Sequence, residues 1–360
     1  MRVTVWRALS PGIATVVLGL GVMTADSGSA TAGELHILTW EGYTDPSFVS
    51  IFENASGCKV TSTFAGSTDE FAAKLAAGGA GNYDLSATGI DATHVINDMG
   101  IVEPIDVSRI ERWNEVYDFL REHPGVNAGG TILALPWAWG VDLLMYRTDM
   151  IAAEPTSVAA LWDPAHQGKV SMWDDKSTLY WGALALYGKG FDVYNMTDDQ
   201  LEAVKQKLIE QKPLIRQYWA TAGELVDLYA KGEVWISSTW GGYQSALVAE
   251  QGIPVKEFAP EEGSFGWVDN WQVIKGTPNL DCIYAWLNFA LSSDAQCGMV
   301  KVTGYAGVNP AALRGCLTEE EFKSRHQDDE AFLQRLSIYQ KPPRIDVYIN
   351  TWNAVKASPN

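Results

Sequence analysis

Histidine and cysteine, which supply many metal ligands and catalytic nucleophiles, are scarce in this chain of 360 residues. The five histidines are scattered and form neither a His-Glu-x-x-His motif nor another spacing of paired metal ligands. A Gly-x-Ser-x-Gly nucleophile elbow and a phosphate-binding loop are also missing. The glycines of "GGAGNYD" at 78–84 are typical of a helix end followed by a turn. These absences predict a protein that is not an enzyme and that uses no cofactor and no metal.

Long hydrophobic runs are equally scarce. The apolar run at 13–23 follows Arg2 and Arg7 and precedes Ala-Thr-Ala at 30–32. This run is too short to span a bilayer as a stable helix, and no cysteine follows it that could carry a lipid anchor. A positively charged beginning, an apolar middle part and small residues at the end are together typical of a secretory signal peptide. We therefore predict a signal peptide at 1–32 and export of the remaining chain to the periplasm.

Basic residues are few compared with acidic ones, at 26 against 44. Without residues 1–32 the formal net charge becomes −19. A field of this sign repels nucleic acid and anionic lipid and attracts cations. The charge thus excludes a nucleic-acid partner and is compatible with a cationic ligand, although solubility alone would also account for it.

Four cysteines remain after the predicted signal peptide. An oxidising compartment permits disulfides, and four cysteines allow three pairings. Cys297 and Cys316 are close in sequence across a glycine-containing loop, which makes them our first choice for a bond. Cys58 and Cys282 are equally compatible with a role as small buried apolar residues.

Strand and helix patterns alternate along the chain, which predicts parallel strands joined by crossover helices. Because 328 residues exceed what one core usually holds, we expect two α/β lobes, each a mixed sheet flanked by helices. Broken apolar strands at 131–150 and 267–276 suit chain crossings between the lobes. The predicted first lobe comprises 33–140 plus 268–313, and the second comprises 141–267 plus 314–360.

Tryptophan, by contrast, is abundant, with fifteen copies. Several aromatic residues stand at expected strand ends, next to an acid or a glycine, outside the expected cores; they are Trp40, Tyr43, Trp173, Trp240, Trp267 and Tyr305. Each one alone would ordinarily be a packing residue. Ligands of open α/β sheets bind beyond the carboxyl ends of strands, so the repetition indicates a cleft that grips a cation or a sugar.

Energetics favour the cation. Removing an ammonium group from water costs several kcal/mol, and each aromatic face returns about 0.5–2 kcal/mol. Three or four rings therefore offset most of this cost, and a carboxylate supplies direction and the remaining energy. Asp91, Asp175 and Asp269 are the candidate carboxylates. A sugar is the second candidate ligand, because an uncharged ligand would not account for the strong negative charge of the protein.

The chain resembles the periplasmic polyamine-binding proteins, the spermidine/putrescine receptors of ABC transporters. The resemblance extends over the expected mature chain, in order, through "LTWEGY", "YDLSATGIDATHV", "LPWAWG", "SMWDD", "GEVWISSTWGGY", "FGWVDNWQVIKG" and "TGYAGVNP". It implies a two-lobe Venus-flytrap fold that closes over cargo in the cleft between its lobes. It also implies a monomeric receptor without chemistry of its own, which docks on the permease subunits of an ABC importer.

The resemblance also implies roles for individual residues. Trp40 and Tyr43 correspond to aromatics of the amine site, and Trp240 and Trp267 to the rings that flank its methylene chain. The ammonium-binding carboxylates correspond to Asp175 and Asp269, and the further polar contacts to Tyr305 and Gln340.

Two positions depart from the family's pattern. Thr178 stands where spermidine binders carry a Glu, and Asp91 stands where they carry a Tyr. One acid is thus lost and another gained, so the cargo is putrescine, spermidine or a different amine. Three other ligand classes remain alternatives: an amino-acid-like compound, a quaternary ammonium compound and a sugar. Arg216 could pair with the carboxylate of an amino-acid-like ligand, or it could have only a surface role.

Overall fold

The computed structural model describes residues 33–335 and 337–359, so the predicted signal peptide lies outside the described residues. The larger of its two main sheets has the strand order β14-β7-β13-β3-β1-β2, and β4 pairs with β13. Strands β1, β2 and β3 run parallel, whereas β13 is antiparallel to β3, β4 and β7. The bounds are β1 (Glu34–Thr39), β2 (Lys59–Phe64), β3 (Leu85–Gly89), β4 (Val102–Glu103), β7 (Leu135–Val141), β13 (Gly266–Ile274) and β14 (Ala306–Gly307).

The smaller sheet has the order β10-β9-β11-β8-β12 and is also mixed. Its strands are β8 (Leu143–Arg147), β9 (Val170–Trp173), β10 (Ile215–Trp219), β11 (Ile236–Thr239) and β12 (Val255–Phe258). A short hairpin, β5 (Asn127–Ala128) with β6 (Thr131–Ile132), is separate from both sheets. We call the larger sheet with its helices the large lobe and the smaller sheet with its helices the small lobe.

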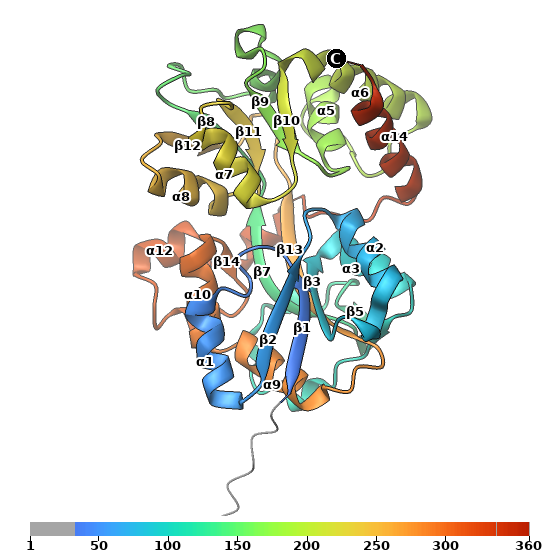
Figure 1. The fold of residues 1–360 in the computed structure, drawn as a ribbon, viewed down its shortest axis with the longest axis vertical. Helices are drawn as coiled ribbons and strands as arrows, with labels where there is room; N and C mark the ends of the chain where they lie inside the picture. Colours follow the sequence, from blue (N-terminus) through green and yellow to red (C-terminus); the bar gives the residue numbers. More distant parts are fainter. Residues whose placement is uncertain (1–32, 336, 360) are drawn as a thin grey trace, which may run out of the picture. The chain divides into compact units, whose positions relative to one another are not determined.

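Helices cover both faces of each sheet (Figure 1). In the large lobe α1, α9 and α10 pack together, and α2 packs on α3. In the small lobe α5, α6 and α14 pack together, and α7 packs on α8. The longer helices are α1 (Pro46–Ser56), α2 (Thr68–Gly78), α3 (Ile90–Asp98), α5 (Thr178–Tyr187), α6 (Asp198–Gln211), α7 (Ala222–Ala230), α8 (Tyr243–Glu250), α9 (Leu280–Ala290), α10 (Ser293–Thr303) and α14 (Ile345–Ala357). The shorter ones are α4 (Asp118–Arg121), α11 (Pro310–Leu313), α12 (Glu319–Ser324) and α13 (Glu330–Arg335).

Local sequence signals explain where these helices begin. The Ser67 hydroxyl caps α2 by accepting from the backbone N–H of Glu70 (3.2 Å), which is one half of a capping box. The Glu70 carboxylate, however, accepts from the backbone of Gly66 (2.8 Å), so this box is only half formed. At α6 a capping box is complete, with reciprocal bonds between Thr197 and Gln200.

The chain passes between the two sheets at several adjacent segments. It leaves β7 for β8 through Asp142, returns between β12 and β13, and passes again between α13 and α14. These segments are hydrogen-bonded to one another, because the Asp142 N–H donates to Phe265 O (2.9 Å) and the Gly266 N–H donates to Ser337 O (2.9 Å). The second passage thus precedes the stretch at 267–276, which lies within the large sheet as most of β13.

Both disulfides lie in the large lobe. Cys297 of α10 is bonded to Cys316, which confirms our first choice. Cys58 is bonded to Cys282 of α9, so the alternative that these two are merely small apolar residues is wrong. Two lobes with mixed sheets and flanking helices confirm the predicted fold class. The residue boundaries of the two lobes stay a prediction.

Candidate functional site

One cavity of about 480 Å³, part of it open to solvent, is lined by residues of both lobes and of the passages between them. The lining residues are Trp40, Tyr43, Thr68, Gly89, Asp91, Asp142, Trp173, Asp175, Trp240, Trp267, Asp269, Tyr305 and Tyr339. Of the nine residues that the sequence predicts for the site, all except Gln340 are therefore brought together here.

Three indole rings from both lobes meet on one side of the cavity. Trp40 follows β1, Trp173 ends β9, and Trp240 follows β11. Their centroids are 5.5–5.9 Å apart in each pairing. Our expectation that the strand-end rings stand apart from the core is wrong, since Trp40 is only 8% exposed and Tyr43 only 1%. Trp40 is covered by Trp173 and Trp240 of the small lobe, whereas Tyr43 packs on Trp137 and Tyr305 of its own lobe.

Asp269 forms one end of the polar lining. It lies on β13 opposite Gly89 of β3, where a missing side chain leaves room for carboxylates. A Cβ at Gly89 would lie 3.0 Å from Asp91 Oδ1 and 3.6 Å from Asp269 Oδ1. The Tyr43 hydroxyl donates to Asp269 Oδ2. Burial raises the pKa of Asp269 to about 7, although the hydrogen bond from Tyr43 favours its ionised form.

Asp142 is a second carboxylate in the cavity, and the sequence reasoning missed it. The Tyr339 hydroxyl donates to Asp142 Oδ2. Oδ1 is buried and has no hydrogen-bond partner among the residues that the structure describes. Burial raises the pKa of Asp142 to about 8, against the opposing effect of the bond from Tyr339, and the other carboxylates of the cavity raise it further. An unpartnered buried acceptor of this kind fits a donor brought by a ligand.

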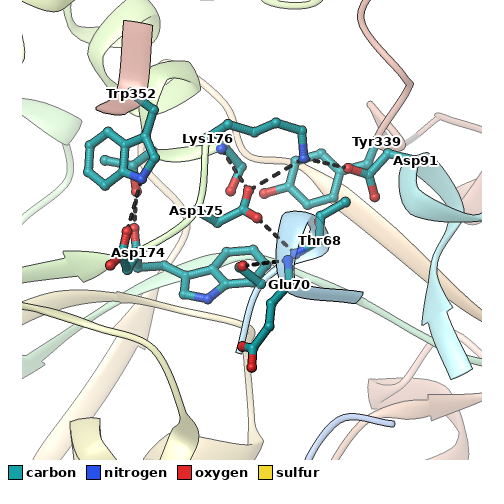
Figure 2. Close-up of polar contacts among 12 residues, drawn as sticks. Thr68, Glu70, Asp91, Asp174, Asp175, Lys176, Tyr339 and Trp352 are labelled. Carbon is teal, nitrogen blue, oxygen red and sulfur yellow. Dashed lines mark hydrogen bonds and ion pairs between the residues drawn. The ribbon is translucent and has the colours of Figure 1, made fainter. Parts of the chain in front are cut away.

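Asp91 and Asp175 line the same cavity but are engaged by a cation of the protein itself. Lys176 Nζ lies 3.2 Å from Asp91 Oδ2 and 3.7 Å from Asp175 Oδ1 (Figure 2). Asp175 also accepts from the backbone N–H groups of Thr68 (3.1 Å) and Ser177 (2.8 Å). Burial disfavours the charged lysine, but attraction to Asp175 and Asp91 outweighs this effect and raises the pKa of Lys176.

The remaining residues that the sequence singled out lie elsewhere. The Thr178 hydroxyl donates to Trp173 O (2.6 Å), so it is occupied by the backbone. Arg216 pairs with Glu233 (3.1 Å) at the surface of the small lobe, and its guanidinium has the surface role that we kept as an alternative. Gln340 is exposed and borders a different, more open pocket. Its predicted contact with the ligand stays a prediction that the placement does not support.

Signals for the missed residues exist in the sequence but are weak. Asp142 follows directly after the broken strand "LPWAWGV", where the chain passes between the sheets. Lys176 follows the predicted acid in "WDDK". Neither position has a pattern that separates a cavity residue from an ordinary surface residue, because both depend on contacts between distant segments.

Comparison with known proteins settles the family. A family model described as bacterial extracellular solute-binding protein matches residues 47–328. The chain belongs to this family. The predicted resemblance to solute receptors of ABC transporters is thereby confirmed, and with it a small-molecule ligand and permease partners.

Relatives of this solute-binding protein are known from several bacteria. It is 28% identical over 314 residues to the putrescine/cadaverine-binding protein of Pseudomonas aeruginosa, covering 82% of this chain and 86% of the relative. It is 26% identical to the spermidine/putrescine-binding periplasmic protein of Escherichia coli, covering 83% of each. A gamma-aminobutyric acid-binding protein of Pseudomonas aeruginosa is 24% identical, with 81% and 82% covered.

Solved structures share the fold. A substrate-binding protein of a spermidine/putrescine ABC transporter from Streptococcus pneumoniae superimposes with a TM-score of 0.70 at 22% identity, covering 90% of this chain and 98% of that one. A protein from Listeria monocytogenes gives a TM-score of 0.80 at 21% identity, covering 90% and 99%.

In the described part of the solute-binding protein, no helix has the length and apolar character needed to cross a bilayer. Over the same residues, no cluster of three or more His, Cys, Asp and Glu side chains is placed to hold a metal ion.

Proposed function

We propose that this solute-binding protein captures a small polyamine, with putrescine as the first candidate, and delivers it to the permease of an ABC importer. The observation that carries this proposal is one cavity in which indole faces and buried carboxylates meet. No Lys or Arg is among the described residues that line it. Names of relatives that bind putrescine or spermidine support the same ligand class.

Charge and hydrogen bonding both favour an amine with more than one N–H donor. Asp269 and Asp142 each accept one tyrosine hydroxyl, which leaves further acceptor positions on each carboxylate. An ammonium group has three donors and a positive charge, so it restores what burial removes from an ionised carboxylate. The aromatic faces of Trp40, Trp240 and Trp267 then cover the methylene groups and add cation–π attraction.

An amino-acid-like ligand is disfavoured by the same cavity, although one relative binds gamma-aminobutyric acid. A ligand carboxylate would face four carboxylates of the protein. The cation nearest to them, Lys176, is already paired, and Arg216 lies at the surface. A quaternary ammonium compound has no N–H to donate to Asp142, and a sugar would leave the carboxylates without a counter-charge.

Cellular location and assembly follow from the family as proposals. Relatives are periplasmic proteins, so we infer that residues 1–32 direct export and that the protein works in the periplasm as a monomer. The receptor carries out no chemistry, and its strongly acidic charge keeps it from nucleic acid.

A thermal-shift screen tests the ligand class. Putrescine, spermidine, gamma-aminobutyric acid, choline and maltose are each added to the mature protein. An amine at a hundred times its Kd is expected to raise Tm by about 5 °C, because a ligand of the native state adds about 2.7 kcal/mol of stability. A shift with maltose and none with any amine would overturn the proposal.

The variant Asp269→Asn tests the site itself. It leaves a buried ammonium without its carboxylate and is expected to weaken putrescine binding in calorimetry by more than about 2 kcal/mol, a factor of about 30. Asp281→Asn serves as the control, since Asp281 is exposed at the start of α9. Equal affinity of both variants would remove Asp269 from the site.

A further inference from the structure

Lys176 is a charged residue beside the cavity that the proposed function does not use. It lies in the turn between β9 and α5 of the small lobe, and its side chain is fully buried. Its ammonium is placed between Asp175 of the same turn and Asp91 of the large lobe (Figure 2). Both of these carboxylates line the cavity, whereas the lysine lies behind them.

This arrangement has the form of a cation subsite that is already filled. Two carboxylates from opposite lobes face one ammonium, which is how a ligand ammonium would be held when the lobes close. Both oxygens of Asp175 are engaged, Oδ1 by Lys176 (3.7 Å) and the Ser177 N–H, and Oδ2 by the Thr68 N–H. Asp91 keeps only Oδ1, which points toward Gly89 and Asp269.

We propose that the side-chain ammonium of Lys176 takes the place of one ammonium group of a polyamine, so that this receptor selects diamines over triamines. The inference rests on the proposed function and narrows its ligand class. Two positions then remain for ligand ammonium groups. One lies at Asp269 with Tyr43, and the other at Asp142 with Tyr339.

The two remaining positions are matched in kind. Each pairs a buried carboxylate with one tyrosine hydroxyl, and neither of these carboxylates has an ion pair among the described residues. Asp142 Oδ1 has no partner at all within that part of the chain. A third ligand ammonium would meet Asp175 only after displacing Lys176, and it would be repelled by this lysine at short range.

The departures noted in the sequence acquire a common explanation. The gained acid, Asp91, is the partner of Lys176 across the lobes. The position of the lost acid, Thr178, is turned to the backbone of Trp173. Lys176 pairs with Asp91, and position 178 carries no acid. An internal ion pair therefore stands where a ligand ammonium could otherwise bind.

The variant Lys176→Met tests this inference, because it removes the charge and keeps an unbranched side chain. Calorimetric titrations with putrescine and spermidine are carried out on the full mature protein. Wild type is expected to bind putrescine at least tenfold more tightly than spermidine. In Lys176→Met the ratio of spermidine to putrescine affinity is expected to rise at least tenfold, since the freed carboxylates accept the third ammonium.

Two controls separate selectivity from structure and from general charge. Lys231→Met removes an exposed lysine of the small lobe and should leave the ratio unchanged. The double variant with Asp91→Asn and Lys176→Met removes the ion pair without adding net charge, and Asp175 keeps its backbone donors. We expect this double variant to fold, to bind putrescine and to show a smaller rise of the ratio than Lys176→Met, because only Asp175 is freed.

The outcomes are distinguishable. If spermidine binds wild type as tightly as putrescine, or if Lys176→Met strengthens both ligands equally, the inference about Lys176 is wrong while the amine receptor stands. A lysine with a purely structural role would lower Tm on replacement and leave the ratio as it was, which also overturns the inference. If no amine binds either protein, the proposed function fails, and this inference fails with it.

Discussion

At the scale of single residues, the carboxylates of the cavity fall into two pairs that differ in their interaction partners. Asp175 and Asp91 are ion-paired with Lys176, whereas Asp269 and Asp142 are held by tyrosine hydroxyls. Burial therefore raises the pKa of the latter two, to about 7 and about 8. Asp269 and Asp142 have no ion-pair partner among the described residues, so their negative charges are the ones that a cationic ligand would neutralise.

These raised pKa values predict the pH dependence of stability and binding. Both folded-state pKa values lie above the usual value near 3.8, so the folded protein without ligand holds its protons more tightly than the unfolded chain. This stabilisation is complete below about pH 4 and is lost as the pH rises through 7 and 8. An ammonium ligand instead requires the ionised forms. We expect Asp269 and Asp142 to release protons when putrescine binds.

Calorimetry in buffers with different ionisation enthalpies measures this release. Putrescine should bind at least about tenfold more tightly at pH 8 than at pH 5.5, since each proton held at the lower pH must first leave. Asp269→Asn should reduce the number of protons released. An affinity that is flat or falls as the pH rises would contradict the assignment of these two carboxylates to the ligand.

At the scale of elements, adjacent strands place one ring against a glycine. Trp267 of β13 pairs with Gly140 of β7 in the register of the large sheet. A Cβ at Gly140 would lie 2.3 Å from Trp267 Cζ2, so the indole occupies the space that any other residue would need. The ring in turn contacts Tyr305 at 4.6 Å between centroids, and its Nε1 donates to Trp240 O (2.9 Å).

Gly140→Ala is therefore expected to displace the Trp267 ring and to weaken putrescine binding by at least about 1 kcal/mol, since overpacking typically costs about 1–3 kcal/mol. Indole fluorescence and calorimetry measure the two effects. Gly315→Ala is the matched control, because a Cβ there meets no atom within 4 Å. Wild-type affinity in Gly140→Ala would show that the position of this ring does not matter to the ligand.

At the scale of the whole molecule, contacts between the lobes complete the cavity. The Trp173 Nε1–H donates to Gly66 O (2.8 Å), and the backbone N–H of Gly223 donates to Glu41 Oε2 (3.1 Å). Gly66 approaches the small lobe so closely that a Cβ there would lie 2.6 Å from Ala220 O. This arrangement buries the ligand position from both sides, and only such a closed form contacts cargo with both lobes.

Gly66→Ala should therefore disfavour closure without disturbing either lobe. We expect putrescine affinity to fall at least tenfold, and small-angle scattering with saturating putrescine to give a larger radius of gyration than for wild type. Gly81→Ala is the control, since its Cβ meets no atom within 4 Å. The idea fails if Gly66→Ala closes around putrescine with wild-type affinity.

Sequence alone determined the elements and much of the site. Strand and helix alternation, caps such as Thr197 with Gln200, and the aromatic residues at strand ends depend on local patterns that can be read along the chain. Eight of the nine expected site residues line one cavity because strand ends of both sheets meet there. The resemblance to a known receptor family supplied the expected roles of the individual site residues.

Only the tertiary structure decided which carboxylates are available to a ligand. Asp142 and Tyr339 come from separate passages between the sheets, and Lys176 meets Asp91 across the two lobes. Hydrogen bonds and ion pairs act over a few ångströms in space, regardless of separation along the chain. For this reason the number of charged residues can be read from the sequence, whereas the ion pairs among them depend on the folded structure.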